Sequence, residues 1–352
     1  MLYIVTGATG HLGNTLIKTL ANAGEKVRAF VLDKESTAML DQYPIEIYRG
    51  NVLNLDSLRE LLNLSNTEYT YEDICLIHTA GIISISSREN KGMYNVNVNG
   101  TKNILYLAKE LGIGHLIYIS SVHAITEPKE DVVIKESLVF DPETVVGSYA
   151  KTKAEATRLV TEAYLEGYPI TIIHPSGIIG PFDYGSAHMS TMMINYFNNK
   201  LNARIDGMYD FVDVRDIAEA IYKASQKKAY GHYLITGHQI QLKGFFAIMQ
   251  DIAGRKYKAV VFTHAFIKIF LPLLEYVARK NKKPPLFTRY SLYTLISHSN
   301  FSYEKATRDL DYVPRPIYDT IRDNALWLVG QKKINHKKTA KYILRKFLPL
   351  YL

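Results

Sequence analysis

Cysteine is almost absent from this chain of 352 residues, since Cys75 is the only one. A single cysteine excludes a disulfide framework and a cysteine-based metal site, and we expect a cytoplasmic protein with no bound metal. Long apolar runs are also missing, because the longest candidate, 265–278, is interrupted by Lys268, Pro272 and Glu275. A transmembrane helix needs about 18 apolar residues in a row, so we expect none. The first residues lack the basic and apolar regions of a signal peptide.

Acidic residues are missing from segment 332–346, which contains seven Lys and Arg, while the whole chain has a formal net charge of +8. This segment therefore supplies most of the excess, and the rest of the chain is nearly neutral. A nearly neutral body argues against nucleic acid as a partner. The tail 331–352 also contains apolar residues such as Ile343 and Phe347. A basic amphipathic tail either lies on an anionic membrane surface or docks its apolar side on its own lobe or a partner, and both alternatives stay open.

Short β-rich runs alternate with helical patterns over the first 180 residues, which is typical of a parallel sheet with crossover helices. We expect strands at 2–6, 26–32, 46–48, 74–78, 116–120 and 170–174, and helices at 12–23, 56–62, 94–111 and 148–166. The predicted fold class is therefore α/β, with a doubly wound parallel sheet of the Rossmann type. This domain would comprise 1–175 and about 211–236. A smaller, mostly helical substrate lobe would comprise about 176–210 and 237–330, and the basic tail would follow at 331–352.

The first predicted strand and helix are joined by the turn Gly7-Ala8-Thr9-Gly10-His11-Leu12-Gly13. Here Gly7 would allow the tight turn, Gly10 would let the backbone approach a pyrophosphate, and Gly13 would let the helix pack closely. Amides at the helix N-terminus would hold the pyrophosphate. The spacing G-x-x-G-x-x-G differs from the better-known G-x-G-x-x-G, and three glycines can simply end a strand. The position between a strand and a helix nevertheless favours nucleotide binding.

Tyr149 and Lys153 lie four residues apart near the start of the predicted helix 148–166, so they share one helix face. An ammonium group near a phenol favours the phenolate and lowers the tyrosine pKa, which makes the phenol usable as an acid–base group. By itself the pair is a weak signal in a chain with 26 tyrosines. The predicted fifth strand ends in Ser120 and Ser121, and ligands collect at this edge of a parallel sheet. One of these serines would hydrogen-bond the substrate oxygen, and the other would only complete the turn.

Together, the glycine turn, Ser121 and Tyr149-x-x-x-Lys153 resemble the extended short-chain dehydrogenase/reductase family, also called the NAD-dependent epimerase/dehydratase superfamily. Further motifs match in the same order along residues 1 to about 330. They are His78-Thr79-Ala80-Gly81, Asn97-Val98-Asn99-Gly100-Thr101, Pro175-Ser176-Gly177-Ile178-Ile179-Gly180-Pro181 and Phe211-Val212-Asp213-Val214-Arg215-Asp216. The stretch 301–316 is similar to the branch that contains 3β-hydroxysteroid dehydrogenases and dihydroflavonol-4-reductases, although Asp311 replaces a glycine of that branch.

The resemblance implies a role for each matching residue. Tyr149 would be the acid–base group, Lys153 would hold the nicotinamide ribose and lower the phenol pKa, and Ser121 would orient the substrate oxygen. Asn97 would brace the helix against the fourth strand. The implied cofactor contacts are Gly7, Thr9, Gly10, His11, Leu12, Gly13, Leu32, Lys34, Asn51, Val52, Thr79, Ala80, Gly81, Tyr149, Lys153, Pro175 and Ile178. A homodimer through the long helices is also implied.

The chain departs from the family pattern at several positions that bear on the cofactor. His174 stands where an arginine usually precedes Pro175, and a buried core histidine is the favoured interpretation. Asn51 replaces the usual aspartate after Gly50 and can still bind adenine. A carboxylate after the second strand would select NAD, but position 31 is Val. The sequence therefore favours NADP slightly over NAD.

The residues of the predicted lobe bear on the substrate. A nucleotide-sugar site needs cationic groups for a diphosphate, yet the only arginines between Pro181 and Gly237 are Arg204 and Arg215. The lobe is instead rich in large apolar residues, most of which would form its core. Segment 265–278 has a surplus of them, which an apolar pocket or a membrane-facing entrance would explain. We predict an NAD(P)-dependent oxidoreductase acting on a secondary alcohol or ketone of a bulky apolar substrate, steroid- or flavonoid-like. The alternatives are a nucleotide-sugar epimerase or dehydratase with tightly bound NAD, and a non-catalytic cofactor-sensing protein.

Overall fold

A computed structural model describes residues 1–84, 90–128, 132–201, 203–255, 260–262, 280, 288–297 and 300–350. The apolar segment 265–278 lies outside the described residues. None of the helices in these ranges combines the length and the apolar composition needed to cross a bilayer.

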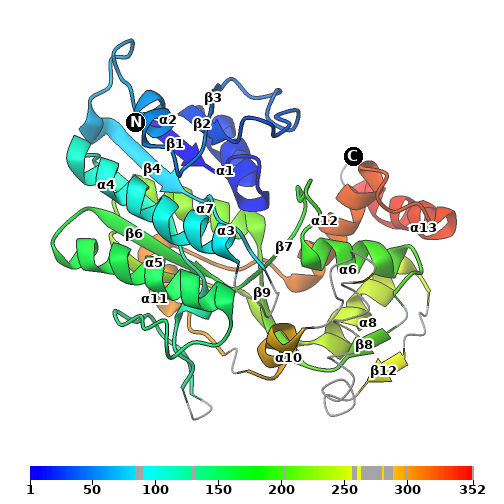
Figure 1. Ribbon diagram of the computed structural model, residues 1–352. Coiled ribbons are helices and arrows are strands. Elements are labelled where there is room, and N and C mark those ends of the chain that lie inside the picture. Colours follow the sequence, from blue (N-terminus) through cyan, green and yellow to red (C-terminus); the bar gives the residue numbers. More distant parts are fainter. Residues whose placement is uncertain are drawn as a thin grey trace.

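A seven-stranded sheet forms the centre of the first domain (Figure 1). Its strands are β1 (Leu2–Thr6), β2 (Lys26–Val31), β3 (Glu46–Arg49), β4 (Ile74–His78), β5 (His115–Ile119), β6 (Ile170–Pro175) and β10 (Gly231–Ile235). The order is β10-β6-β5-β4-β1-β2-β3, and all neighbours are parallel. The chain winds outward from β1 to β3 and then returns to the other side of β1 at β4. The predicted doubly wound fold is confirmed, and in folds of this kind ligands bind where the winding reverses.

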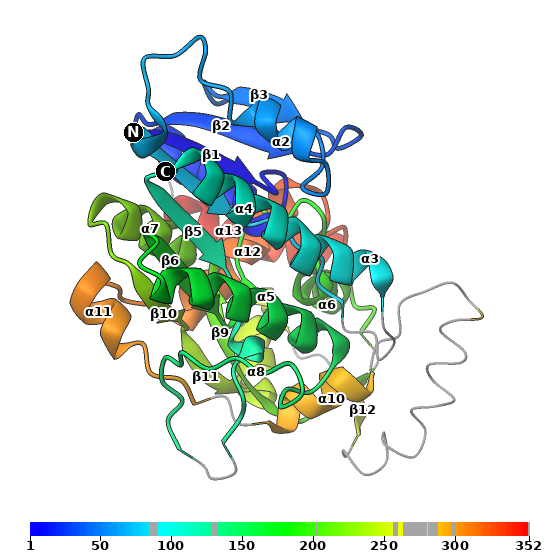
Figure 2. The same ribbon diagram turned by 60° about the vertical axis from the view of Figure 1, so that its left-hand side comes forward.

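Helices cover both faces of this sheet (Figure 2). Those on one face are α1 (His11–Asn22), α7 (Val214–Gln226) and α11 (Glu304–Leu310), and those on the other are α2 (Leu55–Leu61), α4 (Thr101–Leu111) and α5 (Ser148–Leu165). Because successive strand residues point to opposite faces, Tyr3 and Val5 pack with α1 whereas Leu2 and Ile4 pack with α4 and α5. Both faces of β1 are therefore buried, as its unbroken apolar run predicts.

The predicted helix 94–111 is not uniform. It consists of α3 (Lys91–Tyr94), a π-helical turn at Asn95–Gly100 and then α4. Within the wide turn the Thr101 hydroxyl donates to the Asn97 carbonyl oxygen at 2.7 Å. Such turns often carry functional side chains, and this one carries Asn97.

The second lobe is mostly helical, as predicted, with small sheets between the helices. Its helices are α6 (His188–Phe197), α8 (Leu242–Ala253), α10 (Arg289–Ile296), α12 (Ile317–Gly330) and α13 (Lys337–Phe347). Its strands are β7 (Gly177–Ile179), β8 (Ala203–Ile205), β9 (Met208–Asp213), β11 (His238–Gln241) and β12 (Val260–Phe262), arranged as β11-β9-β7 and β12-β8. Phe197, Phe245 and Leu328 are fully buried in its core.

Helices α11 and α13 pack in other parts of the molecule than the predicted domain boundaries indicate. Ala306 and Leu310 of α11 pack into the core of the first domain, although the sequence analysis places them in the substrate lobe. Helix α13, expected as a separate tail, buries Ile343 and Phe347 in the lobe core together with α8 and α12. The apolar side of the tail therefore docks on its own lobe, which is one of the two alternatives for it.

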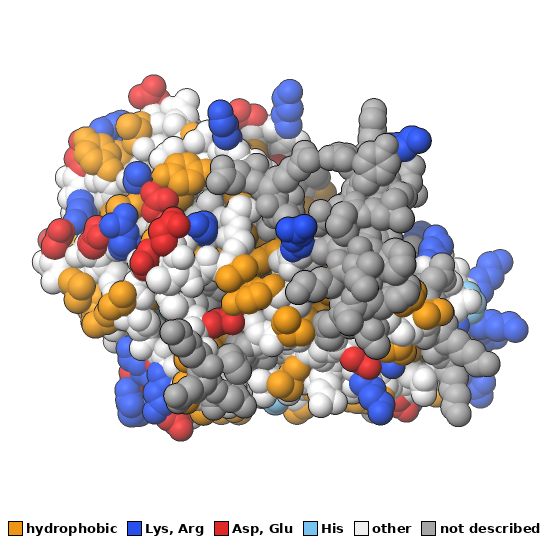
Figure 3. Space-filling model, turned by 60° about the horizontal axis from the view of Figure 1, so that its bottom comes forward, with side chains coloured by type: hydrophobic (Ala, Val, Ile, Leu, Met, Phe, Trp, Pro, Cys, Tyr) orange, Lys and Arg blue, Asp and Glu red, His pale blue; other side chains and the backbone are white. Residues whose placement is uncertain are grey.

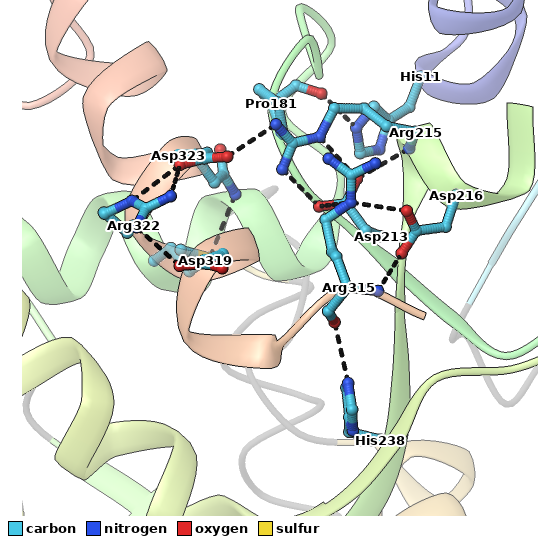
Figure 4. Close-up of polar contacts among 12 residues, drawn as sticks. His11, Pro181, Asp213, Arg215, Asp216, His238, Arg315, Asp319, Arg322 and Asp323 are labelled. Atoms are coloured by element: carbon cyan, nitrogen blue, oxygen red, sulfur yellow. Dashed lines mark hydrogen bonds and ion pairs between the residues drawn. The ribbon is translucent and has the colours of Figure 1, made fainter. Parts of the chain in front are cut away.

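A network of ion pairs connects β9 and α7 to the C-terminal part of the chain (Figure 4). Arg215 bonds Asp213 at 2.7 Å and Asp323 of α12 at 2.8 Å. Arg315 bonds Asp216 at 2.6 Å. The Asp213 side chain is only 1% exposed, and a carboxylate buried this deeply needs such partners. The Phe211–Asp216 motif therefore fixes the lobe against the cofactor domain.

Candidate active site

The glycine turn has the tight geometry that the sequence predicts. Gly7 has φ +69°, and a Cβ there would lie 2.7 Å from the Ala80 Cα. A Cβ at Gly13 would lie 2.1 Å from the Gly7 carbonyl oxygen. Gly10 is the N-cap residue of α1, so the first amides of that helix are available to an anion. These residues fit the pyrophosphate of a dinucleotide, because a side chain at Gly7 or Gly13 would close the turn.

The segment after β4 runs directly beside this turn. The Thr79 hydroxyl donates to the Thr6 carbonyl oxygen at 2.6 Å, which ties the ends of β1 and β4 together. The Asn97 side chain accepts from the Ile82 amide at 2.8 Å and donates to the Ile82 carbonyl oxygen at 3.0 Å. It also donates to the Thr152 hydroxyl of α5 at 3.1 Å. Asn97 thus braces both the β4 segment and the helix that carries Tyr149.

The two serines after β5 have different surroundings. The Ser120 hydroxyl is buried and hydrogen-bonded to the Thr157 hydroxyl at 2.6 Å, so it serves to fasten β5 to α5. The Ser121 hydroxyl accepts from the His123 amide at 3.2 Å and lies close enough to Tyr149 to lower the pKa of its phenol. Ser121 is therefore the serine that lies with the tyrosine, as the resemblance implies.

Tyr149 and Lys153 project from the first turns of α5 toward the end of β5. The Lys153 ammonium donates to the Ile119 carbonyl oxygen at 2.7 Å. A Cβ at Gly81 would lie 3.4 Å from Asn97 Oδ1 and 3.8 Å from Lys153 Nζ, so these three residues adjoin. Tyr149 is only 7% exposed. The structure therefore brings the four predicted catalytic residues to the edge of the sheet that carries the glycine turn.

Burial dominates the pKa values of this pair. It raises the Tyr149 pKa to about 12, and the nearby Ser121 hydroxyl opposes that effect. Burial also lowers the Lys153 pKa to about 8. Desolvation of the phenolate therefore governs the Tyr149 pKa in the chain by itself. The lowering of that pKa by Lys153, which the resemblance implies, stays a prediction.

The other predicted cofactor residues follow the same sheet edge. Pro175 ends β6 and Ile178 lies in β7, while Leu32 and Lys34 are exposed after β2. Val52 packs close to Gly100, where a Cβ would lie 2.7 Å from the valine side chain. The remaining three residues of this group are Asn51 after β3, Ala80 after β4 and Leu12 in α1. The His11 side chain lies against the segment after β7, where its Nε2 contacts the Pro181 carbonyl oxygen at 2.9 Å (Figure 4).

His174 is a core residue, as the favoured interpretation predicts. It is fully buried, and its Nε2 lies 3.0 Å from Nδ1 of His232. The Phe140 ring stacks on both imidazoles with centroid separations of 5.4 Å. Burial and the neighbouring His232 hold the pKa of His174 well below its usual range, so the pair is neutral.

An aromatic wall beside Tyr149 was not predicted. His123 Nε2 lies 2.6 Å from the Tyr209 hydroxyl, and the two rings stack. The His123 ring also meets Tyr149 edge to face, with centroids 6.3 Å apart, and lies 5.7 Å from the Tyr290 ring. Burial lowers the His123 pKa to about 4, so its imidazole is neutral at physiological pH. His123 follows Ser121 by two residues, which is the one sequence signal that could have drawn attention to it.

Tyr290 connects this wall to the second lobe. It comes from α10, and its ring occupies the space where a Cβ of Gly147 would lie, 2.4 Å from the nearest ring atom. Gly147 has φ +97° and directly precedes α5. The Tyr290 hydroxyl is buried without a hydrogen-bond partner in the described part of the chain. A tyrosine from the lobe therefore packs against Tyr149, and its hydroxyl has no hydrogen-bond partner among the described residues.

Glu35 is a further residue that lies at the site without being predicted there. Its carboxylate accepts a hydrogen bond from the Thr9 hydroxyl of the glycine turn. The sequence indicates position 31 as the place for a carboxylate, and nothing in the local pattern predicts that Glu35, four positions later, reaches the turn.

Comparison with known families decides the membership of this chain. The model of the NAD dependent epimerase/dehydratase family matches residues 3–236, which include the glycine turn, Ser121 and Tyr149. The chain belongs to this family. Members of the NAD dependent epimerase/dehydratase family use a nicotinamide dinucleotide, and the predicted resemblance is confirmed.

Three similar proteins cover most of the chain. Sterol demethylase protein B of Methylococcus capsulatus is 27% identical over 332 residues, which are 93% of this chain and 98% of that protein. A putative dihydroflavonol 4-reductase of Synechocystis is 29% identical over 257 residues, 72% of each chain. The crystal structure of gox2253 has a TM-score of 0.80 at 26% identity and covers 95% of this chain and 99% of its own. Along its length the chain is thus similar to proteins of the expected branch.

Proposed function

We propose that this member of the epimerase/dehydratase family is an oxidoreductase for a secondary alcohol or ketone on a bulky apolar substrate. The observation that carries the proposal is the convergence of Ser121, Tyr149 and Lys153 at the edge of the sheet that holds the glycine turn. The names of two relatives, a sterol demethylase protein and a putative dihydroflavonol reductase, support a steroid- or flavonoid-like substrate.

Each residue of the site has a task in this reaction. When bound, the nicotinamide supplies or accepts the hydride. Tyr149 moves a proton to or from the substrate oxygen, and Ser121 donates a hydrogen bond to the same oxygen. Lys153 holds the ribose hydroxyls, and Asn97 keeps Thr152 and α5 in position. The neutral His123, with Tyr209 and Tyr290, forms a wall suited to a flat apolar ring system.

A substrate screen tests the proposal. The purified protein is mixed with sterols, bile acids or flavonoids and with each nicotinamide dinucleotide in turn, and nicotinamide absorbance is followed. We expect turnover of at least one ketone or alcohol. Turnover of nucleotide sugars alone, together with release of tightly bound NAD on denaturation, would establish the epimerase alternative instead. Dinucleotide binding without any turnover would favour a cofactor sensor, for which the complete set of Ser121, Tyr149 and Lys153 is unnecessary.

We also propose that α13 binds an anionic membrane surface electrostatically. Its apolar side is buried in the lobe, whereas Lys337, Lys341 and Arg345 repeat every four residues on the exposed side, next to the exposed Leu344. Figure 3 shows Lys and Arg side chains projecting from the right-hand edge, the side on which Figure 1 draws α13. Each cation near such a surface contributes about 1 kcal/mol of binding.

The homodimer that the resemblance implies stays a prediction.

We expect the protein to sediment with phosphatidylglycerol vesicles at low salt and to be released at about 0.5 M salt, since salt screens surface charges. Changing Lys337, Lys341 and Arg345 together to Glu should abolish sedimentation. A control with Lys26, Lys91 and Lys102 changed to Glu has the same net charge and should still bind. Equal loss in both triple variants would show that net charge, not α13, is responsible.

A further inference from the structure

The loop after β2 turns back onto the glycine turn. Strands β1 and β2 are parallel neighbours, with Thr6 paired to Phe30, so the segments that follow them lie side by side. The Glu35 carboxylate accepts from the Leu32 amide at 3.4 Å and from the Thr9 hydroxyl. Glu35 therefore joins the end of β2 to the turn between Gly7 and Gly10.

Arg49 at the end of β3 holds this loop in place. Its Nη1 donates to the carbonyl oxygens of Leu32, Asp33 and Glu35 at 3.2, 2.9 and 3.1 Å. A loop fixed through three carbonyls presents Glu35 in a defined position, partly shielded from solvent. Arg49 and the exposed Lys34 are the cations nearest along this loop, and neither forms an ion pair with Glu35 among the described contacts.

In a sheet of this order the adenosine ribose of a dinucleotide lies between the glycine turn and the end of the second strand. There a carboxylate accepts hydrogen bonds from the ribose hydroxyls of NAD and repels the 2′-phosphate of NADP. The Thr9 hydroxyl, which could otherwise donate to that phosphate, already donates to Glu35.

We infer that Glu35 determines cofactor choice and makes the protein select NAD over NADP. This inference rests on the proposed use of a nicotinamide dinucleotide. It reverses the slight preference for NADP that the sequence indicates, because that preference relied on the lack of a carboxylate at position 31. Glu35, four positions later, brings a carboxylate to the end of β2 because the loop after β2 folds back onto the glycine turn.

The test measures binding to the full-length protein, without substrate, by titration calorimetry with NAD⁺ and NADP⁺. Wild type should bind NAD⁺ on the order of tenfold or more tightly than NADP⁺, as expected for one carboxylate facing a phosphate. Glu35→Gln keeps the side-chain shape and removes the charge, so NADP⁺ should bind tighter and the ratio should fall to about threefold or less. Asp33→Asn is the matched control, because it removes an exposed carboxylate two residues away, and it should leave the ratio unchanged.

Two results would overturn the inference, namely NADP⁺ binding at least as tightly as NAD⁺ to wild type, or an unchanged ratio in Glu35→Gln. Thermal unfolding midpoints within about 2 °C of wild type would show that the variant is folded. The outcome is separate from that of the proposed function. Selective NAD⁺ binding without any turnover would refute only the proposed reaction, while turnover with an unaltered cofactor ratio would refute only the role of Glu35. A protein that binds neither dinucleotide would refute both.

Discussion

Tyr149→Phe should lower kcat by about 10²- to 10⁴-fold, the usual contribution of a positioned acid–base group. The change removes only the hydroxyl that moves the proton, and the ring keeps its packing against Met93 and Tyr290. The dissociation constant for the dinucleotide should therefore change little. Steady-state turnover of the substrate found by screening, together with calorimetric cofactor titration, measures both effects.

Ser120→Ala and Ser121→Ala form a matched pair of controls for this experiment. Both remove a buried hydroxyl at the end of β5, but the Ser120 hydroxyl bonds Thr157, whereas only the Ser121 hydroxyl acts on the pKa of Tyr149. We expect Ser121→Ala to lower kcat and Ser120→Ala to leave it nearly unchanged, with a loss of about 1 kcal/mol in unfolding free energy from the broken bond to Thr157. Full activity in Tyr149→Phe would contradict the assigned role.

Gly13→Ala should nearly abolish dinucleotide binding and lower the free energy of unfolding by about 3 kcal/mol. The new methyl group would lie 2.1 Å from the Gly7 carbonyl oxygen, a backbone atom that cannot rotate away, so α1 must move away from β1. That movement would carry the first amides of α1 away from the pyrophosphate. Urea unfolding and cofactor titration measure the two losses.

Gly330→Ala is the control for this substitution. Gly330 is the last residue of α12, and a Cβ there would have no atom within 4 Å. Alanine in a helix is favoured over glycine by about 1 kcal/mol, so this variant should be as stable as wild type or slightly more stable. If Gly13→Ala were as stable as wild type and bound the dinucleotide equally well, the glycine turn would not depend on the close approach of α1 to Gly7.

The sequence alone determined the architecture of the cofactor domain, because the relevant signals are local. Alternation of apolar runs and helical patterns places β1 to β6, and the glycine spacing identifies the turn without any knowledge of distant contacts. Tyr149 and Lys153 share a helix face through their separation of four residues. Motifs in a fixed order carried the resemblance to the family, which the comparisons confirm.

Only the tertiary structure decided which groups meet across long separations. Ser120 bonds Thr157, so Ser121 is the serine that lies beside Tyr149. Tyr209 contacts His123, and the Glu35 carboxylate accepts a hydrogen bond from Thr9. The tertiary structure also showed that burial governs the Tyr149 pKa in the chain by itself. Periodicity and spacing encode which way a side chain points within its own element. Contacts between loops and desolvation depend on how the elements pack in three dimensions, and short-range patterns contain no record of that packing.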